Sequence, residues 1–272
     1  DCERAGCVYG IAGLPDAGRI PRAGPSVRGH MHQTFAIAEV HSENYRTKTL
    51  VFGRALPSEP GQFVMAWLPD VDEKPYSIAA ADPFSMTVVA VGPFSDALHA
   101  LQPGDRVWIR GPLGQGFRLR AGAAGEHILL AGGGYGVAPL HFLAQRAAAS
   151  GVTVDVCIGA RTADDVLLVD AFERLGAVVR VTTDDGSLGR QGLVTAAIEA
   201  SMETRTPVAV YGCGPVPMLE TVEALCRSRG IPHQLSWEAR MRCGMGLCGE
   251  CEIHGREKDG WLACVDGPVS EG

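Results

Sequence analysis

The sequence predicts an α+β multidomain chain: a six-stranded antiparallel β-barrel, a doubly wound parallel α/β domain, and a small cysteine-rich C-terminal domain. Three observations predict it. Short segments rich in β-branched and aromatic residues, separated by Pro/Gly/Asp turns, fill the chain from Gln33 to about Arg120. From His127 onward, strands alternate with helices. Near the C-terminus four cysteines are closely spaced, at Cys243, Cys248, Cys251 and Cys264.

Composition limits the possible functions. The chain has 272 residues, of which 46% are hydrophobic and 20% charged, as expected of a globular protein with two ordinary domains and an appendage. A net charge of −7 argues against nucleic acid, which requires a basic face. No apolar run approaches the ~18 residues of a membrane span, and no export signal is visible. Nine cysteines together with a thiolate site indicate the reducing cytoplasm.

Residues 1–32 differ from the rest of the chain. They are rich in Gly, Pro and Arg and show neither a helical nor a strand period, so we expect a poorly ordered extension. Cys2 and Cys7 are interpreted as free thiols, and His30 and His32 as surface residues. The remaining boundaries are expected at 33–121 for the barrel, 122–235 for the α/β domain and 236–272 for the cysteine-rich domain.

The barrel is predicted from six strands with turn residues between them. One short helix, about Ser95–Leu101, precedes the last strand. The strands are expected at Thr34–Val40, Thr47–Phe52, Gln62–Trp67, Tyr76–Ala80, Met86–Val91 and Val107–Arg110.

The α/β domain is predicted from buried strands that alternate with amphipathic helices. Strands are expected at His127–Ala131, Thr153–Gly159, Ala177–Thr183 and Val208–Cys213, and helices at Pro139–Ala149, Val166–Leu175, Leu193–Glu199 and Pro217–Arg229. The glycine-rich turn Gly132–Gly136 joins a strand to a helix, where backbone N–H groups can meet a pyrophosphate. The loop Cys213-Gly214-Pro215 ends another strand and should face the same crevice. Either loop is also compatible with a plain tight turn.

The four C-terminal cysteines have the spacing C-x4-C-x2-C-x12-C. This is the plant-type ferredoxin pattern, in which four thiolates hold a 2Fe–2S cluster. Structural zinc prefers paired C-x2-C knuckles, of which there is one, and disulfide frameworks belong to small secreted domains. Cys264 is expected to be the fourth ligand, although the segment Glu252–Ala263 is long enough to supply another one.

These motifs together resemble the ferredoxin–NADP reductase superfamily. The resemblance rests on Lys74-Pro75-Tyr76-Ser77 at a strand, the loop Gly111–Phe117, the Gly132–Gly136 turn and the Cys213 loop. The cysteine pattern followed by Val-Asp-Gly-Pro resembles, more narrowly, the electron transfer subunit of class B dihydroorotate dehydrogenase. The resemblance covers about residues 33–269.

The resemblance implies three cofactors and their residues. FAD should meet Lys74, Pro75, Tyr76, Ser77, Val89, Ala90, Val91, Phe94 and Ser95. NAD should meet Gly132, Gly134, Gly136, Cys213 and Gly214, and the four cysteines should hold the cluster. Ser77 near the flavin N5 and Cys213 near the nicotinamide are the expected catalytic residues.

Two departures from the family pattern affect the flavin site. Lys74 replaces the common arginine and lacks its bidentate fork. Val91 and the Phe94-Ser95 pair replace residues that commonly contact the flavin phosphates, so contacts there are in question. NAD is favoured over NADP, because Asp164 and Asp165 lie close to Arg161 and oppose a 2′-phosphate.

The resemblance implies an oxidoreductase subunit of pyrimidine biosynthesis. It would exchange electrons between NAD(H) and a flavin-containing catalytic subunit, in a heterotetramer. Two alternatives stay open at this point. The chain could be the equivalent NAD(P)-linked subunit of a transhydrogenase or sulfhydrogenase complex, or a binding or redox-sensing module without flavin.

Overall fold

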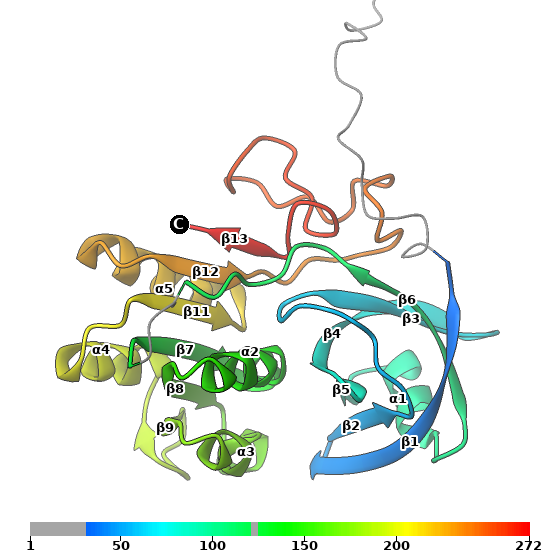
Figure 1. Cartoon of the computed structure of the whole chain (residues 1–272), viewed down its shortest axis with the longest axis horizontal. Coiled ribbons are helices and arrows are strands. Elements are labelled where there is room, and N and C mark those ends of the chain that lie inside the picture. Colours follow the sequence, from blue (N-terminus) through cyan, green and yellow to red (C-terminus); the bar gives the residue numbers. More distant parts are fainter. Residues whose placement is uncertain (1–30, 121–124) are drawn as a thin grey trace, which may run out of the picture.

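The computed structural model describes residues 31–120 and 125–272 (Figure 1). The expected extension falls almost wholly outside the described residues, with Cys2 and Cys7. Six antiparallel strands close a barrel in the order β1-β2-β5-β4-β3-β6, as predicted. The elements are β1 Gln33–Asn44, β2 Thr47–Phe52, β3 Phe63–Leu68, β4 Asp72–Ala81, β5 Phe84–Val89, α1 Pro93–Ala100 and β6 Arg106–Leu113.

The barrel interior is filled by alternate side chains of its strands. Phe35, Phe52 and Phe84 are nearly inaccessible to solvent, and the rings of Phe52 and Phe84 stack at 4.8 Å. Since strand side chains alternate between the two faces of a sheet, the other half of each strand faces outward. One part of that outer face, on β3 and β6, covers the C-terminal segment rather than solvent.

A seven-stranded sheet follows, in the order β10-β9-β8-β7-β11-β12-β13. Helices α2 and α3 pack on one face, and α4 and α5 on the other. The elements are β7 His127–Gly133, α2 Val137–Ala149, β8 Thr153–Ala160, α3 Val169–Arg174, β9 Val178–Thr183, β10 Arg190–Gln191, α4 Val194–Thr204, β11 Ala209–Cys213, α5 Val216–Arg229, β12 His233–Ser236 and β13 Val269–Glu271. This confirms the doubly wound domain.

Three strands were not predicted from the sequence. β10 and β13 are very short, and β12 has four buried residues with no alternation to mark it. β13 runs antiparallel to β12, so the sheet is parallel except at this edge. The end of the cysteine-rich segment therefore belongs to the sheet of the neighbouring domain. Within the described ranges no helix is long and apolar enough to cross a membrane.

Residues 237–268, here called the cluster loop, connect β12 to β13 almost entirely through turns and bends. The loop lies over the junction of barrel and sheet, in orange and red in Figure 1. Its buried residues Trp237, Trp261 and Cys264 share one hydrophobic core with Met65 of β3 and Leu113 of β6. The cluster loop is thereby fixed to both domains.

Candidate functional site

A cavity of about 520 Å³ lies between the barrel, the sheet and the first residues of the cluster loop. We call it the barrel-side cavity. Most of the residues predicted to meet FAD line it, namely Lys74, Pro75, Tyr76, Ser77, Val89, Val91, Phe94 and Ser95, together with Gly136, Cys213 and Gly214. Ala90 does not line it; its N–H group donates to the carbonyl of Arg46.

Several of the predicted flavin residues make contacts within the chain. Tyr76 stacks on Phe94 with ring centroids 6.2 Å apart, and burial raises the pKa of Tyr76 to about 12, so its hydroxyl stays protonated. Lys74 pairs with Asp72 at 2.5 Å, and this hydrogen bond lowers the pKa of Asp72. The Ser95 hydroxyl accepts the N–H groups at the start of α1. Ser95 therefore organises the turn before α1.

A second cavity of about 560 Å³ lies at the carboxyl ends of the parallel strands, where doubly wound sheets bind nucleotides. We call it the sheet-side cavity. Gly134 lines it with φ of +53°, and an added Cβ there would meet no atom within 4 Å. The other two predicted glycines serve packing. A Cβ at Gly132 would lie 2.5 Å from Val137, and one at Gly136 would lie 2.3 Å from the carbonyl oxygen of Cys213.

The two cavities meet at Tyr135 and Glu238, which line both. The Tyr135 hydroxyl donates to Glu238 Oε1 at 3.0 Å. Burial, reinforced by the Glu238 carboxylate, raises the pKa of Tyr135 to about 12. Neither residue was predicted, although Tyr135 lies inside the glycine-rich turn. This pair joins the α/β domain to the cluster loop at the seam between the cavities.

The Cys213 thiol also lies at this seam, in the barrel-side cavity. Burial raises its pKa to about 12, with the Glu238 charge adding to the effect of burial. The thiol is therefore protonated at neutral pH. Part of the residue's surface is open to the cavity, so it can contact a bound ring without carrying a charge.

Asp165 is a polar residue that lines the sheet-side cavity. The sequence predicted that it lies near the nucleotide, but not which residues it contacts. It is 7% exposed and accepts hydrogen bonds from Arg46 at 2.7 Å, Tyr45 at 3.0 Å and Arg161 at 3.1 Å. Burial alone would raise the pKa of Asp165, but the bonds from Tyr45 and Arg161 outweigh it and lower the pKa. Two of these donors come from the barrel, so the contact ties the two domains together across the cavity.

The four cysteines of the cluster loop form two pairs. The Cys243 thiol is in hydrogen-bonding contact with Cys248, and that of Cys264 with Cys251. Two thiolates for each iron is the arrangement that a 2Fe–2S cluster requires. Within the part of the chain that the structure describes, no three Cys, His, Asp or Glu side chains converge on a single metal ion. The two thiol pairs, and not this absence, are what fits a two-iron cluster.

Backbone N–H groups point at the cysteine sulfurs. Met245 and Leu247 donate to Cys243 Sγ at 3.5 and 3.4 Å, and Gly246 donates to Cys264 Sγ at 3.3 Å. Burial would raise the pKa of Cys243, but such bonds lower it to about 7. Burial and the neighbouring Cys251 raise the pKa of Cys264 to about 12. Gly246 has φ of +78°, a conformation that suits glycine and lets the turn close around the sulfurs.

The barrel-side cavity and the cysteines share apolar neighbours. Phe63 lines this cavity and belongs to the same core as Cys251 and Cys264. A Cβ on Gly244, the residue after Cys243, would lie 3.0 Å from the Met65 side chain. Strand β3 thus contacts both sites: Phe63 lines the barrel-side cavity, and Met65 packs under the turn that holds Cys243.

Comparison with known proteins gives two family models. Residues 238–272 match the iron–sulfur cluster binding domain of dihydroorotate dehydrogenase B. Residues 130–224 match the oxidoreductase NAD-binding domain. A probable dihydroorotate dehydrogenase B (NAD(+)), electron transfer subunit, of Thermococcus kodakarensis is 40% identical over 242 residues, which are 89% of this chain and 97% of the relative. The corresponding protein of Methanothermobacter thermautotrophicus is 40% identical over 244 residues, 87% of this chain and 88% of the relative.

The chain belongs to the family of dihydroorotate dehydrogenase B electron transfer subunits. Among solved structures, an NADH-dependent reduced ferredoxin–NADP oxidoreductase aligns with a TM-score of 0.77 and 29% identity over 87% of both chains. The cytochrome b5 reductase domain of Ulva prolifera nitrate reductase aligns with a TM-score of 0.61 and 20% identity, covering 74% of this chain and 94% of that one; it shows the fold alone.

These matches confirm the family, the fold, the oxidoreductase class and the expected cofactors. The iron–sulfur and NAD-binding expectations are met by family models, and that of FAD by the reductase fold shared with flavin enzymes. The roles of individual residues stay predictions. Ser77, Gly136, Cys213 and Gly214 line the barrel-side cavity and Gly134 lines the sheet-side cavity, whereas Gly132 lines neither. The four cysteines lie together in the cluster loop.

Proposed function

We propose that this chain carries electrons between NAD(H) and the flavin-containing catalytic subunit of a dihydroorotate dehydrogenase. The observation that supports this most directly is the order of three sites. The barrel-side cavity meets the sheet-side cavity at Tyr135 and Glu238 on one side. On its other side Phe63 lines the cavity and packs in the same core as Cys251 and Cys264. A bound flavin exchanges electrons in pairs with a nicotinamide and singly with an iron–sulfur cluster, so it belongs in the middle.

The residues of the barrel-side cavity orient the two rings. Tyr76, stacked on Phe94, presents an aromatic face and a neutral hydroxyl. Ser77 supplies a hydroxyl next to it, for a hydrogen bond to the flavin N5. The uncharged Cys213 thiol would pack against the nicotinamide without competing for a proton. The Tyr135–Glu238 pair lines both cavities, so it would border the space where the two rings meet.

A partner subunit is expected to dock on the cluster loop. Leu247 is 81% exposed, and Met245 and Val265 are also exposed. These apolar side chains flank the exposed Cys248. Apolar exposure concentrated at one loop is typical of a protein contact. The proposed assembly is a heterotetramer on a catalytic dimer, in which this loop faces the catalytic chain.

The experiment compares the isolated chain with the reconstituted complex. Alone, the chain should oxidise NADH with artificial electron acceptors but should not reduce NAD with dihydroorotate as donor. Adding the catalytic subunit should restore that reaction. Leu247→Asp should block reconstitution while leaving acceptor activity intact, and Val178→Asp, at an exposed apolar position on β9, is the matched control. Dihydroorotate turnover by the isolated chain would overturn the proposal.

A second function is favoured by one comparison. The NADH-dependent reduced ferredoxin–NADP oxidoreductase aligns over 87% of this chain, so the same architecture also serves electron exchange between nucleotides and ferredoxin. Reduced ferredoxin would then replace dihydroorotate as the donor. Identification of the subunit that co-purifies with the native chain distinguishes the two functions.

A further inference from the structure

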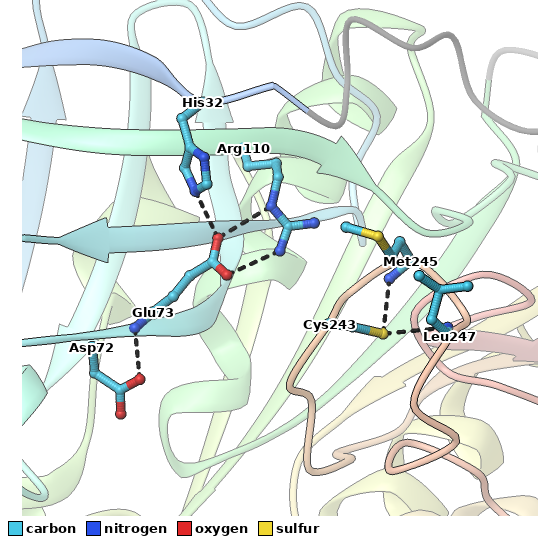
Figure 2. Close-up of polar contacts among 7 residues, drawn as sticks. All are labelled: His32, Asp72, Glu73, Arg110, Cys243, Met245 and Leu247. Atoms are coloured by element: carbon cyan, nitrogen blue, oxygen red, sulfur yellow. Dashed lines mark hydrogen bonds and ion pairs between the residues drawn. The ribbon is translucent and has the colours of Figure 1, made fainter. Parts of the chain in front are cut away.

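Arg110 is a buried cation beneath the cluster loop. It lies on β6 and is 3% exposed. Its directly opposite neighbour on β3 is Met65, and paired residues of antiparallel strands direct their side chains to the same face. Since Met65 lies under Gly244, this face is the one that the Cys243 turn covers. Figure 2 shows the guanidinium between Glu73 and that turn.

Glu73 holds two of the three nitrogens of this guanidinium. Arg110 Nε and Nη2 donate to the two carboxylate oxygens at 3.1 and 3.0 Å. His32 Nε2 contacts the same carboxylate at 2.9 Å and its ring lies 5.2 Å from that of Trp67. His32 is thus held against the barrel rather than free in the N-terminal extension. The fork between Arg110 and Glu73 fixes the orientation of the third nitrogen.

The third nitrogen, Nη1, is buried and has no hydrogen-bond partner among the described residues. Asp72, the residue before Glu73, is paired with Lys74 instead. A buried N–H of a charged group without an acceptor costs free energy. An anionic group in the cluster loop would satisfy the charge, and a cluster held by four thiolates is anionic.

We propose that Arg110 is the electrostatic partner of the iron–sulfur cluster and raises its reduction potential. This inference rests on the proposed binding of a cluster by the four cysteines. Reduction adds one electron and no atoms, so the cluster becomes more negative by one charge. A buried cation stabilises the more negative state of the cluster, because the low-dielectric surroundings screen the attraction between the two charges only weakly. Glu73 positions the cation and offsets part of its charge.

The test is a redox titration of the purified holoprotein, followed by the paramagnetic signal of the reduced cluster. Arg110→Met should shift the oxidised–reduced equilibrium about tenfold toward the oxidised cluster, ~59 mV for a one-electron couple. Glu73→Gln keeps an acceptor for the guanidinium but removes the negative charge that offsets it. This variant should shift the equilibrium about threefold toward the reduced cluster. Arg106→Met removes an exposed cation from the same strand and should leave the potential unchanged.

Iron and acid-labile sulfide are measured first, in the parent and in each variant. A parent chain without a cluster would contradict the proposed function. A cluster that is present, with potentials for Arg110→Met and Glu73→Gln equal to the parent or moved in the same direction, would overturn the inference alone. If Arg110→Met does not fold, the sign of the Glu73→Gln shift still decides: an upward shift supports the role of Arg110 and a downward or absent shift rejects it.

Discussion

The two cavities and the cluster loop are built in different ways. Strand ends, helix starts and short turns of the barrel and the sheet shape the cavities, and residues such as Asp165 are already paired within the chain. The cluster loop has almost no regular structure between Trp237 and Val269. Its shape depends on turns with positive φ at Gly244, Gly246 and Gly249 and on sulfur contacts. We infer that the nucleotide sites exist before their ligands, whereas the metal completes the loop.

The largest expected effect follows from this difference. Replacing Cys243, Cys248 or Cys251 with Ser should abolish iron and acid-labile sulfide, while bound FAD and circular dichroism of the barrel and sheet remain. The reason is that each single replacement leaves one iron with only one of its two protein thiolates. Iron, sulfide and flavin analysis of the same preparation measures the effect.

Cys226→Ala is the control for this prediction. Cys226 is buried on α5, outside the cluster loop, and its replacement should leave the cluster intact. Cys264→Ser tests the fourth ligand. If a triple variant of the first three cysteines retained iron and sulfide, these cysteines would not be the ligands of the cluster.

Substitutions in the barrel-side cavity should have the opposite effect: the variant should lose flavin and keep iron. Lys74→Ala should remove the predicted charge-assisted contact to a flavin phosphate, a type of contact worth about 1.5–3 kcal/mol. Because Lys74 is half exposed and paired with Asp72, we expect the lower end, ~10-fold in Kd.

Equilibrium titration of the chain with FAD measures this effect, with one FAD per chain expected in the parent. Lys74→Arg should bind as well or better. Lys48→Ala, a barrel lysine that donates to the His99 carbonyl, is the control. Unchanged affinity in Lys74→Ala would make Lys74 a surface residue only.

The sheet-side cavity should show a smaller change in nucleotide choice. The parent should prefer NADH, because Asp165 is hydrogen-bonded to Arg46 and Arg161 and adds a negative charge to the cavity. Asp165→Asn frees both cations for a 2′-phosphate and should narrow the preference about fivefold, ~1 kcal/mol.

Steady-state rates with NADH and NADPH measure the preference, and Asp170→Asn, on α3 outside this cavity, is the control. A parent that prefers NADPH more than ~10-fold would reverse the assignment. An unchanged ratio in Asp165→Asn would mean that the paired arginines do not reach the nucleotide.

The smallest change is expected at the seam. Tyr135→Phe removes one hydrogen bond to Glu238, worth about 0.5–1.5 kcal/mol, and should slow flavin reduction by NADH a few-fold without affecting iron content. Because the pKa of Tyr135 is raised to about 12, the hydroxyl stays protonated up to about pH 10, and the rate of flavin reduction should not change with pH over that range. Stopped-flow reduction across this pH range checks both points; a loss of rate centred near pH 8 would contradict the neutral hydroxyl.

Much of the fold could be predicted because it repeats simple patterns. Short segments rich in β-branched and aromatic residues, with turn residues between them, marked the barrel strands. Glycine marked the turn after β7, and cysteine spacing marked the expected metal ligands. The Tyr135–Glu238 and Asp165–Arg46 contacts could not be predicted, because each joins residues that are distant in the chain and have no spacing rule. Strand β13 was missed because three residues carry no detectable period.

The pairing of β12 with β13 has a consequence for protein engineering. Ser236 is directly opposite Val269 in the sheet, so everything between them is an insertion whose two ends are neighbours. Closing such ends with a short turn costs little chain entropy and preserves the register. A shortened chain would keep the sheet but lose Trp237 and Pro268, two walls of the barrel-side cavity. The insert could therefore be grafted onto a related two-domain reductase only together with a reshaped pocket for the flavin ring.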